Sequence, residues 1–212
     1  MKIGVIGSGT MGNGIAHSFA SSGYNVLLHD IEDEMLSKGL ETINKNLGRM
    51  LKKEIINETQ LSETLNNIST TTELNQMKDR DLIIEAVTEN LDVKNSIFSK
   101  LDNITEEGCI LASNTSSISI NELADNTKRP SKVIGMHFMN PVPLMKLVEI
   151  IKTNRTSSET LEVIKQTAIN LKKEPIECLD SPGFISNRIL IPMINEAVYA
   201  LMEGVATKES ID

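Results

Sequence analysis

The sequence predicts an α/β fold: a doubly wound, mainly parallel sheet with helices on both faces. Short apolar segments alternate along the chain with longer segments whose apolar residues recur at helical spacing. Buried parallel strands have continuous apolar sequences, and parallel neighbours need a crossover that is usually a helix. The alternation therefore indicates repeated strand–helix–strand units.

The expected elements follow one another in a regular order. Strands are expected at Lys2–Ile6, Asn25–His29, Asp81–Val87, Cys109–Ser113, Val133–His137, Lys146–Ile151 and Glu174–Cys178. Helices are expected at Thr10–Ser22, Asp33–Glu54, Leu91–Asn103, Ile118–Asp125, Thr156–Leu171 and Phe184–Glu203. A break near Pro182 suggests that residues 1–182 form one domain and residues 183–212 begin an all-helical second one.

The second helix is unusually long and is expected to form a projecting hairpin with the next one. Its apolar residues, spaced alternately four and three apart, are Leu36, Leu40, Ile43, Leu47 and Met50. The partner helix carries Leu61, Leu65 and Ile68, after a turn at Asn57-Glu58.

Composition and charge exclude several classes of function. The chain has 21 Lys and Arg against 29 Asp and Glu, and this net charge of −8 argues against a general binder of nucleic acids or anionic membranes. It has no apolar run of about 18 residues, so no membrane span is expected. Cys109 and Cys178 are interpreted as reduced thiols of a cytoplasmic protein, and no metal site is expected.

A glycine-rich loop follows the first strand and opens the first helix. It matches GxGxxG in the context that dinucleotide-binding, Rossmann-type folds require. The glycines permit a tight turn, close approach to a pyrophosphate and close helix–strand packing, while the helix N-terminus offers free N–H groups. The residues expected to bind the dinucleotide are Gly7, Gly9, Thr10, Met11 and Gly12.

Asp30 ends the second strand, 18 residues after Gly12. An acid at this place accepts hydrogen bonds from an adenosine ribose and repels a 2′-phosphate, so the expected cofactor is NAD rather than NADP. The alternative is a glycine turn beside an unrelated surface aspartate.

His137 stands out among the three histidines. It ends an expected buried strand before a proline-rich turn, and Glu149 lies 12 residues later in an apolar segment, where an acid needs a partner. If the turn brings the two strands together, Glu149 lies next to His137. A histidine oriented by an acid is a general base suited to neutral pH. His17 and His29 are interpreted as packing or surface residues.

Five long segments carry a more specific resemblance. They are VIGSGTMGNGIA, IIEAVTENLDVK, LASNTSSISI, VIGMHFMNPVPLMKLVEII and DSPGFISNRILIPMINEA. In order and spacing they resemble the L-3-hydroxyacyl-CoA dehydrogenase family, close to its bacterial 3-hydroxybutyryl-CoA branch. The resemblance implies reversible, NAD-dependent oxidation of (S)-3-hydroxyacyl-CoA to 3-ketoacyl-CoA.

The resemblance also implies roles for single residues. His137 takes the proton of the 3-hydroxyl, Glu149 orients His137, and Ser116 and Asn187 hold the substrate. Further implied contacts are Glu89, Lys94 and Asn140 with the cofactor, and Lys53 and Asn46 with coenzyme A. The family usually has serine where Asn46 stands, although an asparagine amide also donates a hydrogen bond.

Each of these residues has a simpler interpretation. Ser116 would merely cap the helix expected at Ile118, and Asn187 would be a first-turn residue of its own helix. Glu89 and Lys94 would form a surface pair, although their spacing suits one poorly. The basic cluster around Lys53 would be a solvated helix face.

Two other functions stay open. One is a β-hydroxyacid dehydrogenase that acts on a free acid, and the other is a non-catalytic NAD-binding protein. Family members continue with further helices, so residues 183–212 are expected to be a fragment of the substrate and dimerisation domain. The apolar face of residues 185–201 is then exposed or dimerises by another route, and a homodimer is expected where that domain is complete.

Overall fold

The computed structural model describes residues 1–212. Its strands form one eight-stranded sheet. The strand order is β3-β2-β1-β4-β5-β6-β7-β8, and every neighbouring pair is parallel except β6 and β7. The strands are β1 Lys2–Ile6, β2 Asn25–His29, β3 Ile68–Thr71, β4 Leu82–Glu85, β5 Ile110–Ser113, β6 Val133–Phe138, β7 Leu147–Lys152 and β8 Glu174–Leu179. The order reverses between β1 and β4, the kind of place where open α/β sheets bind ligands. The predicted doubly wound, mainly parallel fold is confirmed.

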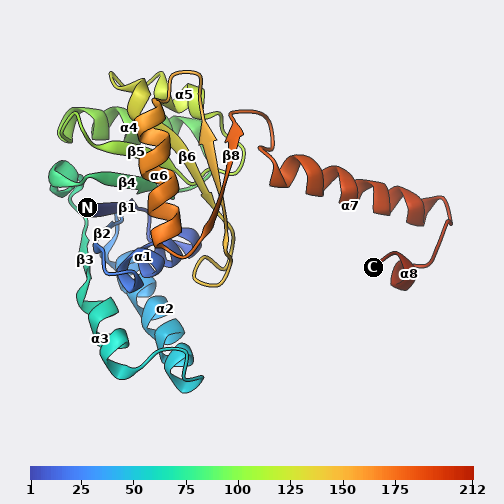
Figure 1. Cartoon of the computed structure of the whole chain (residues 1–212), viewed down its shortest axis with the longest axis horizontal. Coiled ribbons are helices and arrows are strands. Elements are labelled where there is room, and N and C mark those ends of the chain that lie inside the picture. The colour runs from blue at the N-terminus through green and yellow to red at the C-terminus, as the bar shows by residue number, and fades with distance from the viewer.

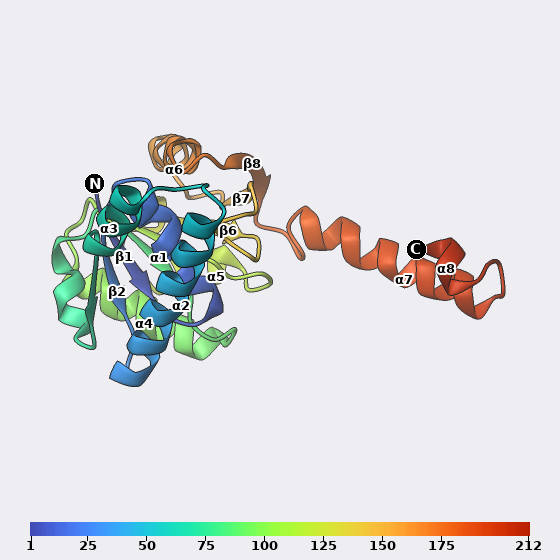
Figure 2. The same ribbon diagram turned by 90° about the horizontal axis from the view of Figure 1, so that it is seen from below.

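Helices cover both faces of the sheet (Figures 1 and 2). They are α1 Thr10–Ser21, α2 Asp33–Lys52, α3 Glu58–Asn66, α4 Leu91–Ile104, α5 Ile120–Ala124, α6 Ser158–Asn170, α7 Ser186–Met202 and α8 Lys208–Ile211, with short 3₁₀ helices at Leu74–Asp79 and Pro130–Lys132. Side chains of α1, α2 and α6 share one hydrophobic cluster with the sheet, whereas those of α4 and α5 share a second one. No helix is both long enough and apolar enough to cross a membrane.

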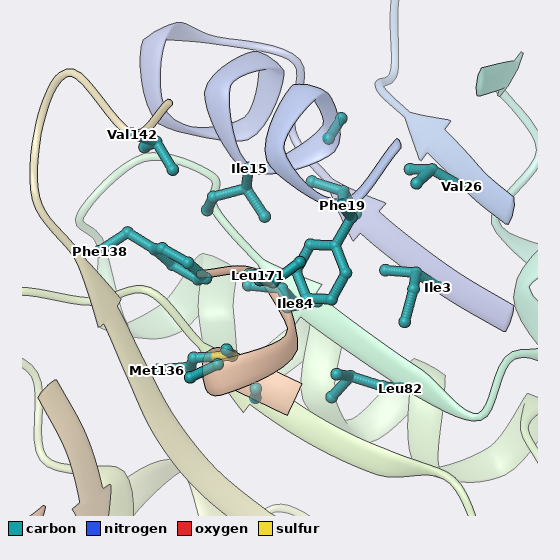
Figure 3. Packing of buried hydrophobic residues seen from close by; sticks show 14 of the residues in the cluster. Ile3, Ile15, Phe19, Val26, Leu82, Ile84, Met136, Phe138, Val142 and Leu171 are labelled. Atoms are coloured by element: carbon teal, nitrogen blue, oxygen red, sulfur yellow. The ribbon is translucent and has the colours of Figure 1, made fainter. Parts of the chain in front are cut away.

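The larger cluster holds α1 against the middle of the sheet. Ile15 and Phe19 of α1 point toward Ile3 of β1, Ile84 of β4 and Phe138 of β6 (Figure 3), and all five are at most 1% exposed. Full burial of one such side chain contributes about 1.5–3 kcal/mol to folding. This packing fixes the direction of α1, and therefore the position of the glycine loop from which it starts.

The sequence prediction is wrong at Ile68. Its spacing from Leu61 and Leu65 fits a helix, but α3 ends at Asn66 and Ile68 begins β3, paired with Val26 of β2. The sheet therefore gains an edge strand that a helical interpretation misses. A capping box between Asn57 and Gln60 starts α3, so Glu58 is already helical and the turn lies at residues 53–56, just before the predicted position.

The predicted hairpin of α2 and α3 projects from the sheet, and only part of its expected seam is buried. Leu36, Ile43 and Leu47 are buried, whereas Leu40 and Met50 are half-buried. At the other end of the chain, α7 extends away from the sheet and buries no residue (Figures 1 and 2). Its most exposed apolar side chains are Ile189, Ile191, Met193, Ile194 and Met202.

Candidate active site

The glycine loop is built so that no side chain fits at two of its three glycines. Gly7 has φ of +96°, and a Cβ there would lie 2.7 Å from the carbonyl oxygen of Ala86. A Cβ on Gly12 would lie 1.7 Å from the carbonyl oxygen of Gly7. A Cβ on Gly9 would meet nothing within 4 Å, so the loop is open on the side where a ligand would lie. The close packing and the open face agree with the roles expected for the motif.

The N-terminus of α1 keeps its donors free for a phosphate. Gly9 caps the helix without a side-chain hydrogen bond, and the first turn contains no acidic residue. Such a terminus presents unpaired N–H groups and a partial positive charge. Thr10 and Met11 are the first residues of this turn, so the chain here fits a dinucleotide pyrophosphate.

Asp30 lies next to the glycine loop, as expected. Its Oδ2 accepts hydrogen bonds from the backbone N–H and the hydroxyl of Ser8, both at 2.7 Å, and its Oδ1 accepts one from the N–H of Ile31. The carboxylate thus ties the loop to the end of β2. It is only partly buried, so its remaining lone pairs are available to a ribose hydroxyl.

The chain brings His137 and Glu149 together by strand pairing. They face each other in the antiparallel register of β6 and β7, and Nδ1 of His137 lies 2.7 Å from Oε2 of Glu149. His137 is 8% exposed and Glu149 is fully buried. This pairing gives the buried acid the partner that the apolar sequence around it requires.

The start of α7 completes the surroundings of Glu149. Its Oε1 accepts hydrogen bonds from the N–H groups of Ile185 at 2.9 Å and Ser186 at 2.8 Å. Burial alone raises the pKa of a carboxyl group, but the Ser186 N–H, the His137 imidazole and the Ile185 N–H outweigh burial and hold the pKa of Glu149 below its usual value. Glu149 is therefore ionised at neutral pH.

Glu89 accepts several hydrogen bonds from the loop that carries Ser116. Its Oε1 accepts hydrogen bonds from the Thr115 hydroxyl at 2.5 Å, the Ser116 N–H at 3.0 Å and the Ser117 N–H at 3.1 Å, and the Ser116 hydroxyl lies 3.3 Å away. Burial raises the pKa of Glu89, but the Thr115 hydroxyl, the Lys94 charge and the other donors bring it to about 2. Ser119 rather than Ser116 caps α5, so the simple capping interpretation of Ser116 is wrong.

Lys94 lies behind this loop, not on the surface. It is 1% exposed, and its Nζ is 2.6 Å from Oε1 of Glu85 and 3.5 Å from Oε2 of Glu89. Glu85, equally buried, also accepts hydrogen bonds from the Val87 N–H and the Ser113 hydroxyl. The interpretation of Glu89 and Lys94 as a surface pair is therefore wrong, and Lys94 contacts the site through Glu89.

One cavity of about 490 Å³ brings six of the expected residues together, at the carboxyl edge of the sheet. They are Met11, Glu89, Ser116, His137, Asn140 and Asn187. The Asn187 amide lies 3.4 Å from the carbonyl oxygen of Ser116, which joins the start of α7 to the Ser116 loop. Because only Nδ1 of His137 is engaged, Nε2 is the nitrogen left for a ligand.

The two expected coenzyme A contacts lie apart from this cavity. Asn46, on α2, lines a smaller cavity of about 180 Å³ that Asn140 also borders. Lys53 is the exposed C-cap residue that follows α2, and it lines neither cavity.

Three residues at the site were not predicted. Ser8 ties the loop to Asp30, and Glu85 holds Lys94. Asn114 lines the cavity and accepts a hydrogen bond from the Phe138 N–H at 2.8 Å. Glu85 and Asn114 carried a usable signal, because each is a polar residue at the carboxyl end of a buried strand. Ser8 carried none, because GxGxxG leaves that position open.

Comparisons with known proteins agree over the whole chain. The model of the family described as 3-hydroxyacyl-CoA dehydrogenase, NAD binding domain, matches residues 2–181, and that of the 3-hydroxyacyl-CoA dehydrogenase C-terminal domain matches residues 183–212.

Bacterial relatives are similar in sequence and in structure. A probable 3-hydroxybutyryl-CoA dehydrogenase of Deinococcus radiodurans is 51% identical over 100% of this chain and 76% of its own length. The 3-hydroxybutyryl-CoA dehydrogenase of Clostridioides difficile is 49% identical over 100% of this chain and 75% of its own. The crystal structure of (S)-3-hydroxybutyryl-CoA dehydrogenase from Ralstonia eutropha matches 100% of this chain and 75% of that chain, with a TM-score of 0.97 and 47% identity. The chain therefore belongs to the 3-hydroxyacyl-CoA dehydrogenase family.

Proposed function

We propose that this chain oxidises (S)-3-hydroxybutyryl-CoA to acetoacetyl-CoA with NAD and also catalyses the reverse reduction. The observation that carries this function is the His137–Glu149 pair, with its 2.7 Å contact, in a cavity beside the glycine loop. Relatives named for 3-hydroxybutyryl-CoA support the short-chain substrate. NAD bound at the glycine loop supplies the acceptor for the hydride of C3.

His137 acts as the general base in this proposal. The ionised Glu149 accepts the Nδ1 proton, which fixes the tautomer in which Nε2 carries a lone pair. Nε2 takes the proton of the 3-hydroxyl, and the resulting imidazolium is stabilised by the carboxylate behind it. In the reduction direction the same nitrogen returns the proton to the substrate oxygen.

Ser116 and Asn187 hold the substrate oxygen. The Ser116 hydroxyl lies 3.3 Å from Glu89 and can rotate, so it donates to the substrate oxygen, while the proton of the 3-hydroxyl points at Nε2 of His137. Asn187 borders the same cavity and adds an amide donor. Groups fixed before the reaction stabilise the changing charge on the oxygen without rearranging in the transition state.

The reduction assay with NADH separates this function from the alternatives. We expect turnover of acetoacetyl-CoA but not of free acetoacetate, and loss of turnover in His137→Gln with NADH binding retained. Turnover of the free acid would favour a β-hydroxyacid dehydrogenase, and NADH binding without turnover of either compound would favour a non-catalytic protein.

The division of the chain is also part of the proposal. We infer that residues 1–182 form the NAD-binding domain and that residues 183–212 belong to a helical domain for substrate binding and dimerisation. The backbone supports a joint here, because Gly183 and Phe184 both have positive φ, +76° and +49°. Exposed apolar side chains on α7, such as Ile191 and Met193, support a homodimer, which sedimentation equilibrium tests.

A further inference from the structure

Five polar side chains at the carboxyl ends of β4 and β5 and the start of α4 form a closed ring of contacts. Nζ of Lys94 donates to Oε1 of Glu85 at 2.6 Å and lies 3.5 Å from Oε2 of Glu89. Glu89 accepts a hydrogen bond from the Thr115 hydroxyl at 2.5 Å. The Thr115 N–H donates to the Ser113 hydroxyl oxygen at 3.1 Å, and the Ser113 hydroxyl donates to Oε2 of Glu85 at 2.7 Å. We call these five residues the Glu85 ring.

Most of the Glu85 ring is buried, and its ion pair is not explained by stability alone. Glu85, Lys94 and Thr115 are each 1% exposed, and Ser113 is fully buried. Only Glu89 borders the catalytic cavity. Replacing a buried ion pair by well-packed apolar residues is often neutral or stabilising, so a buried pair is weak evidence for a contribution to stability. Its role lies in what the ring holds, which is the loop that carries Ser116.

One side of the ring fixes this loop through Ser113. Glu85 and Ser113 are neighbours in the parallel register of β4 and β5. The Ser113 hydroxyl uses its proton on Glu85 and a lone pair on the Thr115 N–H, so it links the two residues in one direction only. Thr115 directly precedes Ser116, and its backbone is therefore fixed by the end of β4.

The other side of the ring fixes the loop through Lys94 and Glu89. Lys94 lies between two carboxylates and is nearer to Glu85, at 2.6 Å, than to Glu89, at 3.5 Å. Glu85 is thus the main counter-ion of the lysine, and Oε1 of Glu89 is left to accept from the N–H groups of Ser116 and Ser117 at 3.0 and 3.1 Å. Without Glu85, Glu89 would be the remaining counter-ion of a buried ammonium group and would be drawn away from these donors.

We propose that Glu85 is a positioning residue for the reaction, which fixes the loop through the Glu85 ring so that the Ser116 hydroxyl meets the substrate oxygen. The inference rests on the proposed function, in which Ser116 holds that oxygen. Glu85, Lys94 and Ser113 do not line the cavity, so they act through residues that do. A donor lowers the barrier most when it is already in place before the charge on the oxygen changes, and the ring holds Ser116 in this way.

Ser113→Ala opens the ring without changing a charge or adding volume. One hydrogen bond is worth up to about tenfold in an equilibrium, so we expect kcat for the reduction of acetoacetyl-CoA to fall about three- to tenfold. The Kd for NADH should stay within about twofold of the wild-type value, because Lys94 and Glu89 keep their contact. Thr167→Val is the matched control with wild-type kcat, since it removes a buried hydroxyl of α6 that donates only to the Val163 carbonyl and lies outside the cavity.

A double-mutant cycle shows whether the effect passes through Ser116. Removal of a donor to the substrate oxygen costs about 10²- to 10³-fold in kcat, which is the loss expected for Ser116→Ala. If the ring acts through this hydroxyl, Ser113→Ala should lower kcat less than about twofold further in the Ser116→Ala protein. An equal loss in both backgrounds overturns the proposal, as does a wild-type kcat in Ser113→Ala alone.

Glu85→Gln separates positioning from stability. The glutamine oxygen must face Lys94 and the Val87 N–H, so its NH₂ group faces Ser113, whose proton then loses its acceptor. Because both sides of the ring are affected, kcat should fall about 10²-fold. Adding Lys94→Met removes the unpaired charge and should restore part of the Tm, while kcat stays at least about tenfold low. If kcat recovers together with the Tm, the ring is merely structural and the proposal is overturned.

Hydrogen exchange gives a measurement that needs no turnover. The N–H groups of Thr115, Ser116 and Ser117 all donate to members of the ring. Their exchange, followed by NMR, should be faster in Ser113→Ala than in the wild type and unchanged in Thr167→Val. Unchanged exchange in Ser113→Ala overturns the ring as the anchor of the loop. Wild-type protein that binds NADH but does not reduce acetoacetyl-CoA contradicts the proposed function instead, while the exchange rates still decide whether the ring fixes the loop.

Discussion

Replacing Glu149 by glutamine tests whether the acid sets the tautomer of His137. The change keeps the size of the side chain and removes its charge. Glu149 accepts three hydrogen bonds, from Nδ1 of His137 at 2.7 Å and from the N–H groups of Ile185 and Ser186 at 2.9 and 2.8 Å. A glutamine has only one accepting oxygen, so it cannot satisfy both sides of this arrangement.

The hydrogen-bond directions determine the size of the effect. The amide oxygen must face the Ile185 and Ser186 N–H groups, because the NH₂ group there would oppose two donors. The NH₂ group then points at Nδ1 of His137, which becomes an acceptor, and the ring proton moves to Nε2. The nitrogen required as base is then protonated. The equivalent change in a serine-protease triad lowers kcat about 10⁴-fold, so we expect about 10³- to 10⁴-fold here, or about 4–5 kcal/mol in the barrier.

The assay is steady-state reduction of acetoacetyl-CoA together with NADH binding measured by fluorescence. Glu149→Gln should lose kcat, whereas the Kd for NADH stays within about twofold of the wild-type value because Glu149 is fully buried and does not line the cavity. Glu177→Gln is the matched control, since Glu177 lies on the adjacent strand β8 and pairs only with Lys152 and Lys165. A kcat within tenfold of wild type, in a folded Glu149→Gln protein, would refute the tautomer argument.

Three further predictions concern the cofactor, the buried ion pair and the pH dependence. Asp30→Ser should raise the KM for NAD about tenfold or more while that for NADP changes little, because a charge-assisted hydrogen bond is lost; an unchanged preference in the two assays contradicts the assignment. Lys94→Met should lower the free energy of unfolding in urea by about 3–5 kcal/mol by leaving Glu85 unpaired, and the double variant Glu85→Gln/Lys94→Met should recover part of it. The pKa of His17 is about 4 in the folded protein, below its unfolded value of 6.5. As the pH falls, the unfolded chain therefore binds the proton first, and the free energy of unfolding of the wild type should fall by about 3 kcal/mol between these two pKa values. Chemical unfolding at pH 7 and pH 4.5 should show this contribution in wild type and not in His17→Gln.

The sequence predicts the sheet well because each buried strand is a continuous apolar run between polar or glycine breaks. Lys2–Ile6 and Asn25–His29 are found at their predicted bounds. The β3 strand fails for a physical reason: Ile68–Thr71 lies at the sheet edge and is only partly buried, so it needs no continuous apolar run. An edge strand gains its stability from pairing with β2, which local sequence does not report.

Some features of the candidate site are also predictable from the sequence, and others are not. The pairing of His137 with Glu149 follows from a strand, a turn and an apolar segment, because opposite residues of an antiparallel pair are neighbours. The burial of Lys94 does not follow, since a lysine in the first turn of a helix is ordinarily exposed. Its partner Glu85 lies nine residues earlier on β4, and only the packing of α4 against the sheet brings the two side chains within 2.6 Å. Charged residues buried as a pair are thus the features that local patterns hide.

The short segment that begins α7 contacts the sheet beside His137. Phe184 is buried in the sheet domain, and its ring centroid lies 6.0 Å from that of His137. The N–H groups of Ile185 and Ser186 then meet Glu149, and Asn187 meets the Ser116 loop. These contacts come from consecutive residues, so any tilt of α7 about Gly183 moves the donors that keep Glu149 ionised. If the carboxylate fixes the His137 tautomer as proposed, the position of the helical segment determines which imidazole nitrogen is free to accept a proton, as well as the shape of the site.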